Sequence, residues 1–432
     1  MSNFKVEIKS KDMIKPFSET PNNLKTLQLS FLDQFAPPVL MPLIFYYQTP
    51  FSQHNNNTTT TTMLLKNSLS ETLVQFYPLA GRVNGNLSID CNDQGVEFYE
   101  ADILASLAEV IANPDLKELT KLLPYAPLSI NNNNIVTAVQ VNHFSCGSMA
   151  IGVCMSHKIA DGATVGAFIK AWARCARGDS NNDKKLVTFD SASFFPPMDL
   201  NGIYDPEIAI CKEELVTRRL IFDKEKLDEL KKQCDNEQLE SPPTRAGVVS
   251  ALLWKMFIKI ARAKPMPTKF FGVSQVVNLR TIKSSPIPEN YHGNLFWSTF
   301  AHTQVEPEIE YTEAVGKLRT AVKKIDTSYL EKIKTGECLV ELQKAYESFS
   351  QGEADFCGVS SLIWFPLYEV NFGWGTPIWV STTTLPFKNT VFLLPTKCGQ
   401  GIEAWMNVLE HDVATLEADQ EFCSLASPII QL

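Results

Sequence analysis

The sequence predicts a mixed α/β protein built from two halves. The chain has 432 residues, which is long for a single domain. Stretches with helical spacing alternate with short runs of β-branched residues throughout. A polar and irregular stretch near residues 178–212 separates the two halves and indicates a crossover. We therefore expect one domain over residues 1–200 and a second over residues 201–432.

The composition is that of an ordinary globular protein, with 44% hydrophobic and 20% charged residues. The 39 Lys and Arg against 48 Asp and Glu give a net charge of −9, which argues against a nucleic-acid or membrane-surface partner. No apolar run approaches the roughly 20 residues of a membrane span, and the ten cysteines form no C-x-x-C pair. We expect a cytoplasmic monomer with reduced thiols that binds small molecules.

In the first half, residues 69–76 carry apolar side chains at helical spacing, and Pro78 ends that helix. Two low-complexity stretches, at residues 54–62 and 131–134, predict surface loops. In NLSIDCNDQGVEFYEA, residues 86–101, two strand patterns flank an Asn-Asp-Gln-Gly turn.

Residues 136–156 are rich in small and β-branched residues and predict two strands that turn near Cys146 and Gly147. GATVGAFIKAWARCAR follows at once, with a spacing of i, i+3, i+4 and i+7 for Val165, Phe168, Ile169 and Trp172. This pattern predicts an amphipathic helix whose apolar face points inward.

The second half begins with two predicted helices. Asp223 can cap the first, and Thr244 can cap the second, over residues 245–263. Beyond them, strand and helical patterns alternate: GVSQVVNL at 272–279, YTEAVGKLRTAVKKI at 311–325 and TVFLLP at 390–395.

The string SHKIADG lies in the turn between the predicted strand and helix of the first half and places His157 four residues before Asp161. Neutral imidazole is suited to removing a proton near neutral pH. The spacing alone is also compatible with an ordinary turn histidine. A thiol mechanism with Cys154 is disfavoured, because residues three apart in a strand point to opposite faces.

Far downstream, NFGWGTP flanks Trp374 with Gly373 and Gly375. Such a pattern suits a bend that backbone or ligand approaches closely. A structural bend packed by an aromatic ring explains it at least as well as contact with a ligand.

Together these strings resemble the BAHD acyltransferases of plants, whose signatures are H-x-x-x-D-G and D-F-G-W-G. The resemblance runs nearly from end to end and includes MIKPFSETP, LSFLDQ, FYPLAGR, DCNDQGVEF, SHKIADG, VVNLR, GNL, NFGWGTPIWV and KCGQGIEA. FDSASFFPP and IFDKEKLDEL are most similar to the branch that acetylates alkaloids.

The resemblance implies two chloramphenicol-acetyltransferase-like domains with a solvent channel between them and His157 at its middle. His157 would act as general base on an acceptor hydroxyl, which attacks an acyl-CoA thioester. No metal and no permanently bound cofactor are expected. Malonyl-transferring members usually carry Y-F-G-N-C, which residues 291–295 match only in part. Acetyl-CoA is therefore the expected co-substrate.

The resemblance also implies roles for further residues. Asp161 would pair with Arg280 rather than orient the histidine. Thr244 and Arg245 would bind CoA, and their place at a helix start suits a phosphate, although a plain cap and a solvated arginine explain them equally well. The acceptor channel would be lined by Phe35, Pro37, Asn294, Phe296, Thr382 and Thr383.

Two positions depart from the family pattern. Asn371 stands where the second motif has aspartate, and Trp364 stands where an arginine is usual. If the missing charges were a pair, losing both would cost less than losing one. On that hypothesis Asn371→Asp lowers the melting temperature, and adding Trp364→Arg recovers part of the loss.

The leading hypothesis is O-acetylation of a bulky alkaloid or terpenoid, such as a triterpenoid. N-acylation and the transfer of a malonyl or larger acyl group are alternatives within the same chemistry. A catalytically silent binding protein is a different class. The changes at Asn371 and Trp364 favour that class slightly, and the complete SHKIADG string disfavours it.

Overall fold

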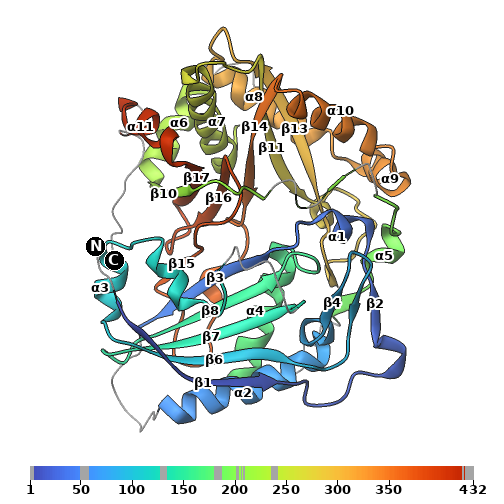
Figure 1. Ribbon diagram of the computed structural model, residues 1–432, viewed down its shortest axis with the longest axis vertical. Helices are drawn as coiled ribbons and strands as arrows, with labels where there is room; N and C mark the ends of the chain where they lie inside the picture. The colour runs from blue at the N-terminus through green and yellow to red at the C-terminus, as the bar shows by residue number, and fades with distance from the viewer. Residues whose placement is uncertain are drawn as a thin grey trace.

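The computed structural model describes residues 4–48, 58–126, 134–179, 187–200, 204–205, 207, 210–234, 242–420 and 423. Two six-stranded sheets organise the molecule, one in the lower and one in the upper part of Figure 1. The predicted mixed α/β class with two sheet-based halves is confirmed. No helix in the described ranges combines the length and the apolar character that a membrane crossing requires.

The first sheet is built mostly from the first half of the chain. Its strand order is β1 (Val6–Ile14), β6 (Val96–Ile103), β7 (Thr137–Phe144), β8 (Met149–Ser156), β3 (Leu40–Tyr47) and β15 (Trp379–Ser381). Helices α2 (Thr58–Gln75) and α4 (Gly162–Ala176) pack together and share its hydrophobic core, and α3 (Leu107–Ala112) adds to that core.

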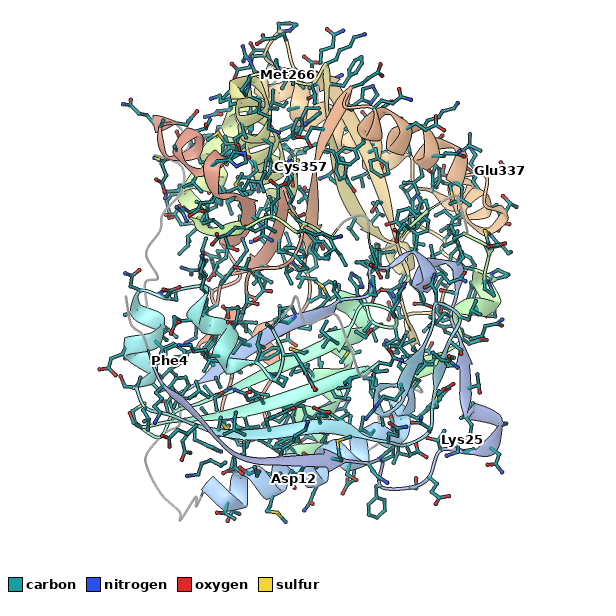
Figure 2. The ribbon with its side chains drawn as sticks, in the orientation of Figure 1. Phe4, Asp12, Lys25, Met266, Glu337 and Cys357 are labelled. Carbon is teal, nitrogen blue, oxygen red and sulfur yellow. The ribbon has the colours of Figure 1, made fainter. Side chains whose placement is uncertain are left out.

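The second sheet has the order β10 (Leu215–Phe222), β17 (Ile402–Leu409), β16 (Thr390–Pro395), β14 (Ala354–Ser361), β11 (Phe270–Asn278) and β13 (Phe296–Gln304). A second core joins one face of this sheet to α6 (Lys224–Gln233), α7 (Arg245–Ala263), α8 (Tyr311–Lys323) and α11 (Val413–Glu417). Figure 2 shows Cys357 of β14 among the side chains of this upper part.

A third, smaller core lies where the two halves meet, around α1 (Phe31–Phe35), α9 (Thr327–Thr335) and the start of β13. The remaining elements are short or peripheral. They are β2 (Thr26–Gln28), β4 (Arg82–Asn84), β5 (Ser88–Asp90), β9 (Thr188–Phe189), α5 (Ser191–Phe194), β12 (Tyr291–His292) and α10 (Leu339–Ser350).

Most of the predicted elements are present. The two strands before His157 are β7 and β8, which pair antiparallel, and α4 buries the four predicted side chains. Asp223 and Thr244 cap α6 and α7 by accepting hydrogen bonds from Lys226 N and Gly247 N.

One local prediction is wrong. Residues 58–62 of the threonine-rich stretch begin α2 and are not a loop, because the apolar face of the following residues anchors the helix and threonine tolerates its first turn. The two strands predicted on either side of the 92–95 turn are present as β5 and β6, and each pairs with other strands. β5 joins β2 and β4, and β6 joins β1 and β7. Residues 54–57 and 131–133 lie outside the described residues.

The chain returns to the first half after residue 200, and the predicted division into two domains did not include this return. β15 pairs antiparallel with β3, so that Val380 lies opposite Phe45. Residues 367–387 contribute Leu367, Phe372, Trp379 and Leu385 to the first hydrophobic core. A short segment of this kind is held by tertiary packing, so its sequence does not reveal which sheet it joins.

Gly162, the glycine of the SHKIADG string, starts α4 in close contact with this returning chain. A Cβ atom on Gly162 would lie 2.5 Å from Leu362 Cδ2 and 3.0 Å from Phe365 Cε2. Gly166, one turn later on the same helix, would meet only Phe365 Cδ1, at 3.9 Å. An added Cβ atom would therefore displace the ends of these two side chains at the first position and would fit without displacement at the second.

We expect Gly162→Ala to lower the free energy of unfolding by about 1–3 kcal/mol, because Leu362 and Phe365 must move. The matched control, Gly166→Ala, should be neutral or stabilising by up to about 1 kcal/mol, since alanine favours a helix interior. Urea unfolding of both variants measures the difference. Equal effects of the two substitutions would contradict the close packing at Gly162.

Candidate active site

His157 follows β8 directly, in the turn that leads into α4. Its backbone N–H donates to Val39 O at 2.9 Å, which ties the turn to the segment between α1 and β3. Its ring lies beside Phe296 at the start of β13, with the ring centroids 5.6 Å apart. The histidine of the first half thus faces a strand of the second half.

Asn294 fixes the tautomer of His157. Asn294 Nδ2 donates to His157 O at 2.6 Å and to Asp33 Oδ1 at 3.0 Å. The amide oxygen therefore faces His157 Nδ1, at 3.1 Å, and must accept a hydrogen bond from a proton on Nδ1. The lone pair of the imidazole is then on Nε2. Burial lowers the pKa of His157, against the opposing charge of Asp161, so the ring is neutral near pH 7.

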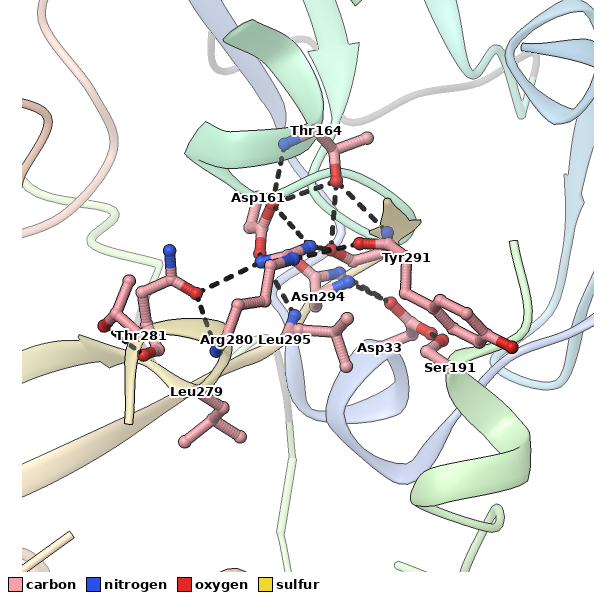
Figure 3. A network of polar contacts seen from close by, with 12 residues as sticks. Asp33, Asp161, Thr164, Ser191, Leu279, Arg280, Thr281, Tyr291, Asn294 and Leu295 are labelled. Atoms are coloured by element: carbon pink, nitrogen blue, oxygen red, sulfur yellow. Dashed lines mark hydrogen bonds and ion pairs between the residues drawn. The ribbon is translucent and has the colours of Figure 1, made fainter. Parts of the chain in front are cut away.

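Asp33 lies behind Asn294 and is completely buried. Its carboxylate accepts hydrogen bonds from Asn294 N (2.8 Å) and Nδ2, and from Ser30 N (3.0 Å), Ser30 Oγ (2.6 Å) and Ser191 Oγ (2.9 Å). Figure 3 shows Asp33, Ser191 and Asn294 in this network. Burial raises the pKa of Asp33, and the hydrogen bonds oppose that rise.

Sequence reasoning did not single out Asp33. One local signal was available, because Ser30 and Asp33 form a capping box at the start of α1, in which each side chain bonds the other's backbone N–H. That pattern predicts the helix start. It does not predict that the carboxylate also holds Asn294, which is 261 positions away.

Asp161 and Arg280 form a buried ion pair, as the family resemblance implies. Arg280 Nη1 lies 2.7 Å from Asp161 Oδ2, and the two side chains are only 6% and 8% exposed. Arg280 also donates to Tyr291 O at 2.9 Å and to Gly293 O at 3.2 Å. The guanidinium is therefore bonded both to the first half and to the segment that carries Asn294.

Asp161 uses its remaining acceptor capacity on backbone donors. It caps α4 by accepting from Thr164 N at 2.9 Å, and it accepts from Leu295 N at 3.1 Å (Figure 3). Burial by itself would raise the pKa of Asp161, but Arg280 and these hydrogen bonds hold that pKa below its usual value. Asp161 is thus ionised at neutral pH and joins the two halves.

Lys158 is a further buried charge beside the histidine. Its Nζ donates to Gln34 O at 3.0 Å and to Asn86 Oδ1 at 2.7 Å. Burial lowers the pKa of Lys158 to about 8. Through these bonds the His157 turn is fastened to α1 and to the turn between β4 and β5.

Three of the residues expected to line an acceptor channel are only partly buried. These are Phe35, which stacks on Tyr204 at 3.8 Å, together with Pro37 and Phe296. The other three, Asn294, Thr382 and Thr383, are buried, and their place in an acceptor channel stays a prediction. Asn294 holds His157 from behind, and Thr382 donates to Pro42 O at 3.2 Å.

The expected CoA residues lie at the start of α7. Thr244 Oγ1 accepts from Gly247 N at 3.0 Å, which makes Thr244 a true helix cap. Arg245 donates to the carbonyl oxygens of Gly399 and Gln400, at 2.5 and 3.0 Å. The guanidinium of Arg245 thereby fixes the turn after β16 against the helix start.

The NFGWG string forms a bend held by its own first residue. Asn371 Oδ1 accepts from Gly373 N at 2.8 Å and from Gly375 N at 3.0 Å, and both glycines have positive φ, 115° and 109°. Trp374 stacks on Phe372, with the centroids 5.5 Å apart, and packs against the first core. These contacts favour the structural explanation of the motif.

Asn371 and Trp364, the two departures from the family pattern, contact different arginines. Asn371 O accepts a hydrogen bond from Arg177, at the end of α4. Trp364 is exposed and lies against Arg245, whose guanidinium carbon is 5.8 Å from the centre of a Trp364 ring. The hypothesis that the two positions were a former ion pair finds no contact to support it.

Cys154 does not have the properties of a nucleophile. It is buried in β8, and its thiol donates to Tyr125 O at 3.6 Å. Burial raises the pKa of the Cys154 thiol to about 12. A thiol mechanism with His157 is therefore disfavoured by the environment as well as by the spacing.

Comparisons with known proteins agree with this geometry. A family model described as the Transferase family matches residues 4–423. Stemmadenine O-acetyltransferase of Catharanthus roseus is 37% identical over 421 residues, which cover 96% of each chain. A limonoid 7-O-acetyltransferase of Citrus sinensis is 35% identical over 98% of each chain. The crystal structure of vinorine synthase, an enzyme of Rauvolfia serpentina, has a TM-score of 0.85 at 35% identity and covers 98% of this chain and 99% of its own.

We expect Asp161→Asn to destabilise the protein by about 3–5 kcal/mol at pH 7, because Arg280 is left buried without a counter-charge. The folded pKa of Asp161 lies below its ordinary value of 3.8, so the pair contributes fully above that pH. The stability that the ion pair contributes is lost as the pH falls through the pKa that Asp161 has in the folded protein. Urea unfolding at several pH values measures this.

The difference in stability between wild type and Asp161→Asn should therefore shrink below about pH 4. Glu417→Gln is the control, since it breaks the exposed pair with Arg218 and should cost less than about 1 kcal/mol. If the difference in the free energy of unfolding between wild type and Asp161→Asn stays constant down to pH 2, the ion pair does not account for it.

We expect Asn371→Asp to leave the melting temperature unchanged or slightly raised. The corresponding gain in the free energy of unfolding should be less than about 1 kcal/mol. The carboxylate keeps an oxygen for Gly373 N and Gly375 N, as a charge-assisted acceptor, and gains Arg177 as a neighbouring cation. Trp364→Arg should act independently, so thermal melts of the single and double variants should give additive shifts. If Asn371→Asp lowers the melting temperature and the added Trp364→Arg restores it, the two positions are coupled, as the ion-pair hypothesis requires.

Proposed function

Because the chain belongs to the Transferase family, the BAHD acyltransferases, we propose that it transfers an acetyl group from acetyl-CoA to a hydroxyl of a bulky specialised metabolite. Relatives named for acetylating an alkaloid and a limonoid support an alkaloid or a terpenoid as the acceptor. The observation that carries the proposal is the state of His157. It is neutral and fixed by Asn294 through Nδ1, so its Nε2 has the free lone pair of a general base.

In the proposed reaction, His157 Nε2 takes the proton of the acceptor hydroxyl as its oxygen attacks the thioester carbonyl. The tetrahedral intermediate then collapses, the C–S bond breaks, and the proton returns from Nε2 to the CoA sulfur. Asn294 Oδ1 accepts a hydrogen bond from Nδ1–H throughout and so stabilises the transient imidazolium. A base positioned in this way contributes roughly 10²–10⁴-fold to the rate.

For CoA we propose the start of α7. Thr244 and Arg245 present a helix N-terminus and a cation, which suit the phosphates of the nucleotide. Arg245 is held by two carbonyl groups and not by a carboxylate, so its positive charge is not neutralised by those partners. The partly exposed residues near His157, which are Phe35, Pro37 and Phe296, are proposed to contact the acceptor. We further propose that the protein acts as a monomer in the cytoplasm.

His157→Ala should keep its affinity for acetyl-CoA and lose turnover by roughly 10²–10⁴-fold. The assay measures thiol release from acetyl-CoA with a panel of hydroxylated alkaloids and triterpene alcohols. For the wild type, kcat/KM should fall on the acid side with a midpoint below 6.5, because burial lowers the pKa of His157 and only the neutral ring accepts a proton. Turnover of His157→Ala within a few-fold of wild type would remove His157 from the mechanism. No thiol release with any alcohol would favour a silent binding protein.

A further inference from the structure

On the face of the second sheet that points away from its helices, one part is buried and the other part is exposed. On β17 and β16 this face is buried, because Trp405, Phe392 and Leu394 pack into the core of the first half. On β14, β11 and β13 the same face is not covered. We call the uncovered part, centred on Val276, Phe300 and Phe356, the open face.

The strand pattern fixes which side chains belong to the open face. Phe271, Val273, Ala301 and Cys357 are buried in the core with α7 and α8, and Cys357 is labelled in Figure 2. Side chains alternate along a strand, so the even-numbered residues of these three strands point the other way. All of the even-numbered residues from Phe270 to Val276, Phe296 to His302 and Ala354 to Ser360 are partly or largely exposed.

Apolar side chains on the open face are exposed to an unusual degree. Val276, Phe300 and Phe356 are 39%, 40% and 42% exposed. Phe349 of α10 packs edge-on against Phe356, with the centroids 5.0 Å apart, and borders the open face. Aromatic side chains gathered on an open surface commonly mark a binding site.

The open face begins at the catalytic histidine. Phe296, its first residue on β13, lies 5.6 Å from the His157 ring. Phe300 is four residues further along β13, about 13 Å from Phe296. Phe356 lies two strands across from His302, about 10 Å from β13. Ser274 pairs with both Phe300 and Gly358 and so occupies the centre.

The chemistry of the open face points to a neutral ligand. Its even-numbered positions carry Phe, Val, Ser, Gly and Ala, with His302 at the far end, and include no Asp, Glu, Lys or Arg. A protonated amine would lack a carboxylate there. At Gly358 the nearest atom to an added Cβ would be 3.7 Å away, so a larger side chain would fit, yet the surface is left shallow.

We propose that the open face binds the ring system of the acceptor, and that this ring system is a neutral, apolar polycycle of the terpenoid kind. The ring system lies along Phe300 and Ser274 while its hydroxyl reaches His157 Nε2. This inference rests on the proposed function and names its substrate class. It places the main acceptor contacts on β11, β13 and β14 and not at Phe35 and Pro37 near α1.

The test compares Ser274→Glu and Phe300→Ala with two controls. The first variant places a charge at the centre of the open face, and the second removes an exposed ring. Ser18→Glu and Phe17→Ala make the same changes at exposed positions after β1, beside α2. Circular dichroism melts establish that all four variants are folded.

The probe is Nile red, a neutral polycyclic dye whose fluorescence rises in apolar sites, titrated into each protein. Ser274→Glu and Phe300→Ala should weaken its binding by about 10-fold or more, and the two controls by less than about twofold. In the thiol-release assay, with the best alcohol of the panel, the same two variants should raise the KM of the alcohol and leave the KM of acetyl-CoA unchanged.

Equal dye affinity in all variants, or no dye binding to the wild type, would overturn the proposal. A best substrate that must be cationic would also overturn it. His157→Ala separates the two hypotheses, because it should bind Nile red normally and release no thiol. If the wild type releases no thiol while Ser274→Glu and Phe300→Ala lose the dye, acyl transfer fails and the apolar site stands. If thiol release is normal and dye binding is unaffected, only the open face fails.

Discussion

The buried ion pair between Asp161 and Arg280 is the contact on which the arrangement of the site depends. It joins the start of α4 in the first half to the segment before β13 in the second half. Two charges in an apolar interface are tolerated only when each finds its partner, so the pair specifies one relative position of the two halves. The backbone bonds of Arg280 to Tyr291 and Gly293 extend this constraint to the residue that holds His157.

From that pair the catalytic geometry follows through short steps. Asn294 is held by Asp33 on one side, so its amide can face the His157 ring in only one orientation. That orientation decides which imidazole nitrogen carries the proton. The histidine therefore needs no carboxylate of its own, and the aspartate four residues later is free to act as a structural anion. The motif combines one chemical and one architectural residue.

The segment that returns to the first sheet has a comparable role on the other side of the molecule. β15 extends the first sheet, and Trp379 Nε1 donates at 3.3 Å to Glu403, which forms a buried ion pair with Arg219 in the second sheet. This contact joins the first core to β10 and β17, and Phe392 and Leu394 of β16 are buried in the same core. The boundary between the covered and the open part of this sheet thus lies between β16 and β14.

The sequence by itself determined most of the elements and the candidate catalytic residue. Periodicity identified α4, α7 and the β7–β8 pair, because helical and strand patterns are local properties of the chain. The two motifs identified His157 and the BAHD family. Only the tertiary structure decided the roles of Asp33, Asn294 and the open face. Asp33 and Asn294 are 261 positions apart, and the exposure of Phe300 depends on what the rest of the chain leaves uncovered. Contacts of this kind are set by packing between distant segments, for which a single sequence carries no periodic signal.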